Sequence, residues 1–517
     1  MGYRFVLAGI LAGSAIAFGQ TSGGTITGTI SDPAGAVVAA AAIEARNTAT
    51  GADYAVASSS TGNYTIVDLP AGTYEITVAV AGFKKYVRPG LIVQAAQTIR
   101  VDAVLEVGAA TESVTVQAET PLLKTETGDV SQTISTEYMN TLPLLDIGTN
   151  GAGVRNPYNL LAIVPGTYYT PPVPGAVGSP DRINGGLGGS ESILIEGMDA
   201  TNMLGQGANA QAQPGQDQIQ EWTVLAGNYN AEYGQAGQAV YNVTMKSGTN
   251  QFHGSLFESY QNAYLNAGQP FTNNGHGKLV NPANTQNDYG FTIGGPVRIP
   301  KVYDGRNRTF FFFNWEQYIR NQYVLGVASG PTTVPSAAYR QGDFSAAITA
   351  DGNRSLGTDP LGANILAGAI YDPATAQVVK GQVVTTQFPN NTIPMSRMNP
   401  IALKIQSLLP QPFCAAGPPC NALGVINNFE NTEYEHRTTS VPSVKADHII
   451  GPRDKLSFFW NRTATYCLTC YGDDGMPQPI SDTFGGGIYA KAIRLNYDRT
   501  ISPTLLLHLG AGYNSDD

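Results

Sequence analysis

Hydrophobic and polar residues alternate along several segments in the second half of the chain, most clearly between residues 505 and 514. Leu505, Leu509 and Tyr513 occupy odd-numbered positions of this segment, and His508 occupies an even-numbered one. Successive side chains of a β-strand point to opposite faces of the sheet. The segment therefore predicts a strand with one apolar and one polar face.

The same alternation recurs at residues 456–463 and 489–498, and from Gln251 onwards we predict about seven such strands. A lipid-exposed barrel strand requires an apolar outer face and a polar inner face. A soluble sandwich gives the same alternation, because one face of each of its sheets is buried. The pattern alone therefore predicts strands and leaves both architectures open.

Shorter strands with close turns are predicted between residues 22 and 107. The alternating runs lie at residues 25–30, 38–45, 64–67, 74–80 and 98–105, with Pro- and Gly-rich turn signals between them. Many short strands with turns this close are typical of a small β-sandwich.

A long stretch between Leu325 and Asn431 is rich in Pro, Gly, Ala and Asn. We predict a long loop there, with a small helix of its own near residues 398–409. Long loops lie on the outer side of membrane barrels.

The composition favours β structure and excludes nucleic-acid binding. Charged residues make up only 13% of the chain, whereas Gly (59) and Tyr (26) are abundant. The net charge is −10, and no basic run is present. A protein that binds nucleic acid needs a positive stripe to meet the phosphates, so we expect no nucleic-acid partner.

Residues 1–19 have the features of a secretory signal peptide. Arg4 supplies the positive end, the run from Phe5 to Ala17 is apolar, and small residues precede a cleavage point. No later segment approaches the run of about 18 apolar residues that a membrane-spanning helix needs. An exported chain of this kind can enter a membrane only as a barrel.

The four cysteines are predicted to form structural disulfides in exposed loops, because exported proteins reach an oxidising compartment. They are Cys414, Cys420, Cys467 and Cys470. The last two form a C-x-x-C, which would also suit a redox pair or half a zinc site. No histidine lies near them in the sequence and no βαβ pattern surrounds them, and their connectivity stays open.

No residue pattern indicates an enzyme. A metallopeptidase needs paired zinc ligands close together on a helix and a glutamate base. The histidines are instead scattered along the chain, at His253, His276, His436, His448 and His508. We therefore expect no catalytic residues, no metal site and no cofactor.

The glycine and aromatic positions of the N-terminal region form a series: Gly28-x-Ile30-x-Asp32-x-x-Gly35, Gly62-x-Tyr64-x-Ile66-x-x-Leu69-x-x-Gly72-x-Tyr74-x-Ile76 and Gly82-Phe83. This series resembles the carboxypeptidase regulatory-like domain, a prealbumin-like sandwich that is often grouped with carbohydrate-binding folds. Residues two apart in a strand share a face, so we interpret them as core and turn residues and not as a binding site.

The region from residue 111 to 248 contains a second series: Leu142-Pro143-Leu144, Val164-Pro165-Gly166, Arg182-Ile183-Asn184-Gly185-Gly186, Ile193 to Asp199, Asn228 to Gly234 and Val243 to Asn250. Its order and spacing resemble the plug domain of Oar-like TonB-dependent receptors. Two departures are visible, Gln238-Ala239-Val240 in place of a common glycine-rich run and Met245 in place of a β-branched or small residue. Further on, Gly294-Gly295-Pro296-Val297 and Lys301 to Phe311 resemble the early strands of the Oar-like barrel.

The resemblance, the aromatic strand ends and the long loops favour a barrel over a soluble sandwich. We expect an all-β dominated chain: signal peptide at 1–19, β-sandwich at 22–107, α+β plug at 111–248 and part of a transmembrane antiparallel β-barrel at 251–517. Barrels of the resembled class have about 22 strands, more than the predicted strands supply. We therefore expect the sequence to be part of a longer gene product.

The resemblance implies a gated receptor of the outer membrane. An extracellular ligand binds outside, and TonB, driven by its inner-membrane motor, pairs with a plug segment as an added β-strand and opens a path. Strand addition needs an extended and accessible segment. The candidate is Glu112, Ser113, Val114, Thr115, Val116, Gln117 and Ala118. The alternative is that these residues form only the first strand of the plug or the last strand of the sandwich.

The ligand cannot be identified from the residues, although the resemblance favours an oligosaccharide or another bulky polymer. Two other functions stay open. One is an Oar-like outer-membrane adhesion or export factor without solute uptake. The other is an exported, soluble carbohydrate-binding β-protein.

Overall fold

The computed structural model describes residues 23–109, 112–116, 126–141, 164–168, 182–187, 190–201, 214–234, 236–265, 284–325, 332–350, 352–414, 420–430, 432–451, 453–471, 479–480, 484–502 and 505–516. The expected signal peptide lies outside these residues. No helix among them is both long and apolar enough to cross a membrane.

The N-terminal region is a two-sheet β-sandwich. One sheet contains β4 (Asn63–Leu69), β1 (Gly24–Ser31), β7 (Thr98–Arg100) and β8 (Ala103–Val104), in which β7 and β8 both pair with β1. The other has the order β3 (Asp53–Ala57), β2 (Ala42–Asn47), β5 (Gly72–Ala79), β6 (Lys85–Val93) and β9 (Ser113–Thr115). The core between the two sheets contains residues that were predicted to point inward, including Ile26, Tyr64, Ile66, Tyr74 and Ile76.

Several predicted strand bounds of the sandwich were wrong. The second strand begins at Ala42, not at residue 38, and the predicted run 98–105 is divided into β7 and β8. Strands β3 and β6 were not predicted. In β6 the alternation is interrupted at Pro89-Gly90, where Gly90 has φ 75° and the pairing with β5 shifts register. Such a shift is a β-bulge, which breaks the period-two pattern.

The plug follows as a mixed sheet with the order β10-β15-β16-β13-β14. Its elements are β10 (Val130–Ser135), α2 (Thr136–Thr141), β13 (Ser192–Ile195), β14 (Met198–Asp199), η3 (Gln216–Gln218), β15 (Ile219–Gly227), η4 (Ala231–Tyr233) and β16 (Val240–Met245), with a separate pair β11 (Thr167–Tyr168) and β12 (Arg182–Ile183). Trp222 and Met245 are buried in its core. Met245 therefore occupies an ordinary core position despite its departure from the family pattern.

The remaining long strands form one antiparallel, seven-stranded sheet in chain order. Its strands are β17 (His253–Asn262), β18 (Asn284–Pro296), β21 (Thr309–Leu325), β26 (Thr432–Gly451), β27 (Asp454–Tyr471), β28 (Phe484–Ser502) and β29 (Leu505–Asp516). At one end, which we call the turn end, Gly451 pairs with Asp454 and Ser502 pairs with Leu505. At the other, which we call the loop end, Leu325 pairs with Thr432 on either side of the long connection between β21 and β26.

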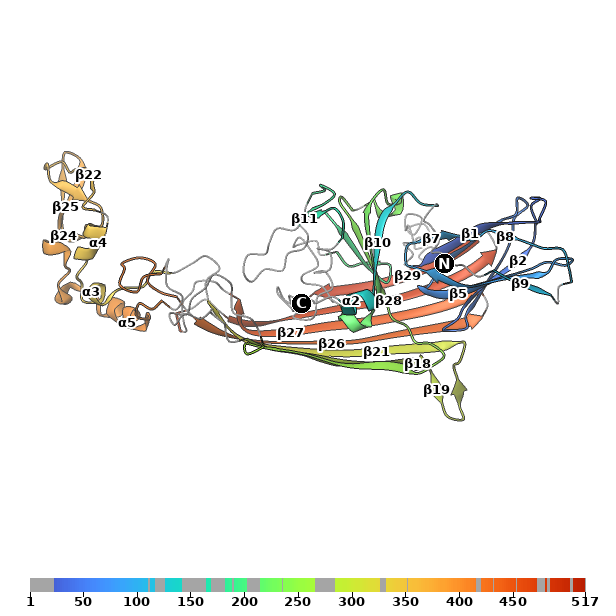
Figure 1. Cartoon of the computed structure of the whole chain (residues 1–517). Helices are drawn as coiled ribbons and strands as arrows, with labels where there is room; N and C mark the ends of the chain where they lie inside the picture. The colour runs from blue at the N-terminus through green and yellow to red at the C-terminus, as the bar shows by residue number, and fades with distance from the viewer. Residues whose placement is uncertain are drawn as a thin grey trace, which may run out of the picture.

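The predicted alternation of faces is confirmed in this sheet. Leu495 pairs with Phe458 on one side and Ala511 on the other, and Leu495 and Leu509 are 44% and 56% exposed. The opposite parity is polar and buried, as at Asn461 and Asn496. The plug lies against this polar face, and the sandwich lies toward the turn end (Figure 1).

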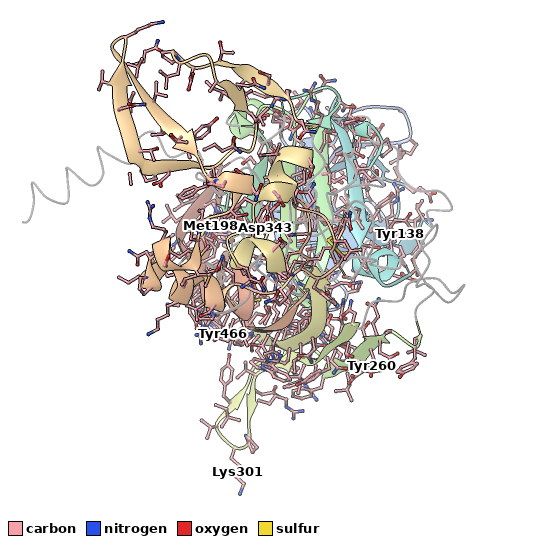
Figure 2. All side chains as sticks on the ribbon, turned by 90° about the vertical axis from the view of Figure 1, so that its left-hand side faces the viewer. Tyr138, Met198, Tyr260, Lys301, Asp343 and Tyr466 are labelled. Carbon is pink, nitrogen blue, oxygen red and sulfur yellow. A yellow bond between two sulfur atoms is a disulfide. The ribbon has the colours of Figure 1, made fainter. Side chains whose placement is uncertain are left out.

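The connection at the loop end folds into a small module that projects away from the sheet (Figure 1). It contains α3 (Ala337–Arg340), α4 (Ser345–Ala350), β22 (Ser355–Thr358), β23 (Asn364–Leu366), β24 (Tyr371–Val379), β25 (Gln382–Gln387), η5 (Pro389–Asn391), η6 (Met395–Arg397) and α5 (Pro400–Leu408). The helix α5 is the small helix that the sequence predicted. At the turn end, the hairpin of β19 (Arg298–Ile299) and β20 (Tyr303–Asp304) carries Lys301 at its projecting tip (Figure 2).

Candidate functional site: the contacts that hold the plug

The predicted TonB-contact segment forms the outermost strand of one sandwich sheet. Strand β9 pairs in parallel with β6, with Val114 opposite Tyr86. The Val116 N–H donates to the Val87 carbonyl at 2.9 Å, and the Lys85 N–H donates to the Glu112 carbonyl at 2.8 Å. Gln117 and Ala118 lie outside the described residues. Residues 113–115 thus form the last strand of the sandwich, and contact of this segment with TonB stays a prediction.

Among the described residues, no strand pairs with the outer edge of β9, because β9 ends the order of its sheet. Backbone groups of successive residues in a strand point to opposite edges. Since Glu112 and Val116 bond to β6, the N–H and C=O groups of Ser113 and Thr115 point to the other edge. Both side chains are exposed. Glu112 lies 3.5 Å from the Lys84 ammonium, whose pKa is raised by hydrogen bonds to Glu106 and Glu112.

A tight turn in the plug places a buried carboxylate against the sheet of β17, β18, β21 and β26 to β29, which we call the wall. Ile195 and Met198 pair directly, and the two residues between them, Glu196 and Gly197, have φ of 52° and 74°. Positive φ at both central positions is the mark of a type I′ hairpin turn. This turn belongs to the 193–199 motif of the plug.

Glu196 makes the central polar contact between plug and wall. Its Oε1 accepts from the Lys445 ammonium at 2.8 Å and from the Met245 N–H at 2.6 Å. The side chains are 6% and 12% exposed, so the ion pair is largely removed from water. Lys445 also donates to the Met245 carbonyl at 3.0 Å, which joins the turn to β16. Because the pair is buried, removal of only one partner leaves the other charge buried and unpaired, which destabilises the fold.

Residues just after β16 join the plug to the turn end of the wall and to the sandwich. The Ser247 hydroxyl bonds Asp447, which also accepts from Ser457 at 2.6 Å. Asn250 donates to the Thr50 carbonyl of the sandwich at 2.7 Å. Its side chain also reaches the Asn307 amide oxygen of the wall at 2.7 Å. One short segment therefore connects all three parts.

The sandwich touches the plug through a buried acid. Glu221 of β15 accepts a hydrogen bond from the Ala95 N–H at 2.7 Å. Burial raises the pKa of this carboxyl to about 7. The hydrogen bond from Ala95 lowers the pKa and offsets part of the effect of burial. The contact therefore contains a group that titrates near neutral pH.

A second contact joins the sandwich to the wall at Asp68, Asp498 and His508, whose ligand-type atoms lie within 4.8 Å of one another. Burial, followed by the charge of Asp498, raises the pKa of Asp68 to about 8. No metal site was expected from the sequence, and this cluster leaves no local pattern because Asp68 is remote in sequence from its two partners. Of the five histidines, only His508 belongs to such a group among the described residues.

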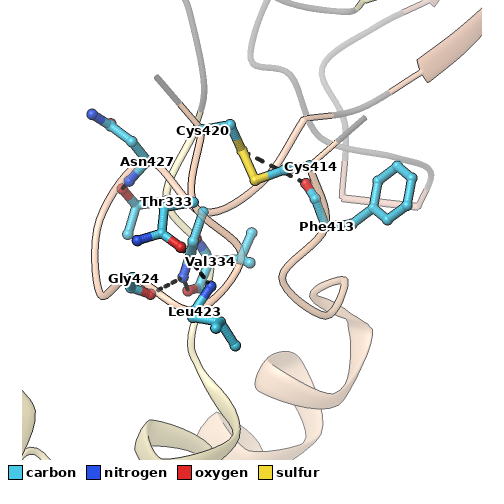
Figure 3. The surroundings of a disulfide bond; sticks show 10 residues. Thr333, Val334, Phe413, Cys414, Cys420, Leu423, Gly424 and Asn427 are labelled. Carbon is cyan, nitrogen blue, oxygen red and sulfur yellow. Dashed lines mark hydrogen bonds between the residues drawn. A yellow bond between two sulfur atoms is a disulfide. The ribbon is translucent and has the colours of Figure 1, made fainter. Parts of the chain in front are cut away.

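Cys414 and Cys420 form a disulfide at the base of the loop-end module (Figure 3). Next to it the Asn427 N–H donates to the Thr333 hydroxyl at 3.0 Å, so the bond lies where the two chain ends of the module meet. Cys467 in β27 is also disulfide-bonded. The side chain of Cys470 lies outside the described residues.

The described contacts are suited to holding and releasing protein parts. They comprise the buried ion pair of Glu196 and Lys445 and the Glu221 carboxyl, each between two segments that are distant in sequence.

Two families match the chain. Residues 244–517 match the family described as "Outer membrane beta barrel domain", and residues 25–106 match "Carboxypeptidase regulatory-like domain". The first match covers more than half of the chain and contains all seven strands of the wall.

A curated protein is similar over a large part of the chain. It is the TonB-dependent transporter Oar of Myxococcus xanthus, which is 28% identical over 305 residues, or 58% of this chain. The matched part is 27% of that protein's own length.

Solved structures of receptors are also similar at low identity. The ferric enterobactin receptor PfeA of Pseudomonas aeruginosa, in complex with enterobactin, has a TM-score of 0.38 and 11% identity, covering 75% of this chain and 41% of that one. The iron transporter FrpB of Neisseria meningitidis has a TM-score of 0.35 and 10% identity, covering 75% and 49%. The siderophore receptor PirA of Acinetobacter baumannii has a TM-score of 0.31 and 14% identity, covering 75% and 48%.

The alternating faces of the wall, the plug against its polar side and the match over residues 244–517 agree with one another. The chain therefore belongs to the outer membrane β-barrel family and is located in the outer membrane, and it carries an N-terminal carboxypeptidase regulatory-like domain.

Proposed function

We propose that the protein is a TonB-dependent receptor that binds an extracellular ligand and admits it when the plug is pulled. The observation that carries the proposal is the buried pair of Glu196 and Lys445, which fastens a plug turn to the wall. A pull must break such contacts to open a path. In this proposal the protein is not an enzyme.

Short turns face the periplasm and long loops face outward in outer-membrane barrels. The turn end of the wall therefore faces the periplasm, and the sandwich with β9 lies on that side. TonB acts from the periplasm in this proposal, so β9 is in the compartment where the partner is found. The loop-end module faces outward and forms part of the ligand-binding side.

We further propose that TonB adds a strand to the free edge of β9, where Ser113 and Thr115 present their backbone groups. Main-chain hydrogen bonds supply the affinity in this mode of binding. Side-chain truncation should therefore have little effect, whereas proline removes a donor and fixes φ.

The ligand class is proposed from the sequence resemblance as an oligosaccharide or another bulky polymer. The loop-end module, closed at its base by the Cys414–Cys420 disulfide, supports recognition of a large ligand because it extends the outward surface. Binding of the purified receptor to an array of defined oligosaccharides tests this class. An array without a positive spot would contradict it.

The test of the TonB contact compares Thr115→Pro with Thr115→Ala in the full chain, folded in detergent. We expect Thr115→Pro to weaken binding of the purified periplasmic domain of TonB at least about tenfold, because one main-chain hydrogen bond and the strand geometry are lost. Thr115→Ala keeps the N–H and should bind within about twofold of the original protein.

Circular dichroism of both variants controls for the fold of the sandwich. Equal TonB binding by Thr115→Pro and Thr115→Ala would show that the contact lies elsewhere in the chain. Proline variants that lose binding together with the sandwich fold would also reject the assignment, since the segment would then be structural only.

A further inference from the structure

Three side chains from distant parts of the sequence meet where the sandwich touches the wall. Asp68 comes from β4 of the sandwich, and Asp498 and His508 are direct cross-strand partners on β28 and β29. Their ligand-type atoms, one from each residue, all lie within 4.8 Å of one another. Carboxylate oxygens and imidazole nitrogens grouped this closely are the kinds of atom that bind a Zn²⁺ ion.

The backbone directs Asp68 out of its sheet. The pairing of β4 with β1 shifts register between Ile66 and Leu69, and Asp68 has φ 56°. Aspartate is one of the few residues that adopt this left-handed conformation readily. The bulge therefore turns a carboxylate toward the wall at a place where a regular strand would not.

The polar groups of this cluster are incompletely paired with one another. The carboxyl groups of Asp68 and Asp498 are in hydrogen-bond contact, which places two acids side by side. His508 bonds Asp498 through Nδ1, while its Nε2 is buried without a hydrogen-bond partner. The His508 side chain is only 10% exposed.

Nearby basic side chains bind other groups. Lys455 lies 3.8 Å from Asp447, and the Arg494 Nε donates to Asn496 at 2.6 Å. Over the part of the chain that is described, the only ion pair that Asp68 or Asp498 makes is the one between Asp498 and His508. The charge of Lys455 acts on both acids without an ion pair to either, and Asp68 makes no ion pair of its own among the described residues.

We propose that Asp68, Asp498 and His508 bind one Zn²⁺ ion that clamps the sandwich to the periplasmic end of the barrel wall. Two carboxylate oxygens and one imidazole nitrogen are ligands that Zn²⁺ accepts, with a fourth position for water. The imidazole disfavours Ca²⁺ and Mg²⁺, which prefer oxygen ligands alone. A divalent cation would also neutralise both carboxylates.

The zinc site would join the sandwich to the wall. Force applied by TonB at β9 would then have to separate these two parts or move them together. Bound Zn²⁺ would hold Asp68 of the sandwich against two neighbouring wall strands. The site does not depend on which ligand the receptor takes up, so its test needs no transport assay.

The experiment uses the full chain folded in detergent, stripped with a chelator and then titrated with Zn²⁺. We expect one equivalent of tightly held zinc, measured by elemental analysis after gel filtration. Asp68→Asn and His508→Gln, which lie on different domains, should each weaken zinc binding at least about tenfold by removing one ligand. Asp102→Asn on the sandwich and His436→Gln on the wall are matched controls that should bind as the original does.

Co²⁺ gives a second measurement, because its visible absorption reports four-coordinate binding. This absorption should be lost in Asp68→Asn and in His508→Gln. Zinc should also raise the melting temperature of the original chain and not that of Asp68→Asn. Absence of a stoichiometric ion at micromolar zinc would overturn the proposal. Zinc that stays bound in both correctly folded site variants would overturn it equally.

Discussion

At the scale of single residues, Glu221 connects the sandwich to the plug with a carboxyl whose pKa is raised by burial to about 7 from 4.5. The folded protein therefore binds more protons than the unfolded chain between these two pH values. Stability from this group is fully present below pH 4.5 and is lost as the pH rises to about 7.

We predict that the free energy of unfolding falls by roughly 3 kcal/mol across this window through Glu221, since each pH unit between the two pKa values contributes about 1.4 kcal/mol. Glu221→Gln should remove this part of the pH dependence. The measurement is chemical denaturation of both proteins at a series of pH values. The same pH slope in both proteins would show that Glu221 does not titrate in this range.

The pair of Glu196 and Lys445 makes a second prediction at this scale. Lys445→Met leaves the Glu196 charge buried without its partner, which typically destabilises by about 3–5 kcal/mol. The double variant Glu196→Gln/Lys445→Met should recover most of that loss, because neither charge is then buried alone.

Trp222 is fully buried in the plug, so its fluorescence can report unfolding of this domain alone. With Trp315→Phe and Trp460→Phe as background, urea titration should give a lower plug midpoint for Lys445→Met than for the double variant. Equal midpoints would show that the pair does not fasten the plug.

At the scale of structural elements, β9 completes the second sheet of the sandwich. We predict that residues 22–107 fold as an isolated domain and that residues 22–116 are more stable, because β9 adds hydrogen bonds to β6. Tyr74→Ala should cost about 3–5 kcal/mol through the loss of a buried aromatic ring. Tyr74→Phe should cost only about 1 kcal/mol, since it keeps the ring and removes the hydroxyl that bonds the Pro70 carbonyl.

Thermal melts of these fragments by circular dichroism provide the measurement. A fragment 22–107 that does not melt cooperatively would argue against an independent sandwich. Equal stability of the two fragments would remove β9 from the domain.

The strands of the wall could be predicted because their alternation has a direct cause, a lipid-facing side against a polar, plug-facing side. Leu505, Leu509 and Tyr513 show it along one strand. Strand β6 could not be predicted, because Pro89 and Gly90 interrupt its period with a bulge. Strand β3 offers only a short run, Asp53–Ala57, with no fully buried residue.

The contacts between domains were the least predictable part. The motif around Glu196 was visible in the sequence, but its partner Lys445 follows only from the register of β26. Asp68 lies beside His508 because the bulge in β4 of the sandwich faces the strand pair β28 and β29 of the wall. Neither relation leaves a local pattern of residue types.

At the scale of the whole molecule, the described contacts link the parts of the protein in series. The sandwich contacts the plug through Glu221 and the wall through Asp68, and the plug contacts the wall through Glu196. In the proposed function TonB binds β9, and a pull there would be transmitted through these contacts to the turn at Glu196. The central claim is that TonB engages the free edge of β9 in living cells.

In-cell disulfide crosslinking tests that claim most directly. Ser113→Cys and Thr115→Cys in the full-length receptor should each crosslink to a cysteine placed in the receptor-binding strand of TonB. Thr65→Cys, an exposed position on the opposite sheet of the sandwich, should not crosslink. We predict crosslinks at 113 and 115 that depend on ligand. Equal crosslinking of Thr65→Cys, or no crosslink at either β9 position, would contradict TonB binding at this edge.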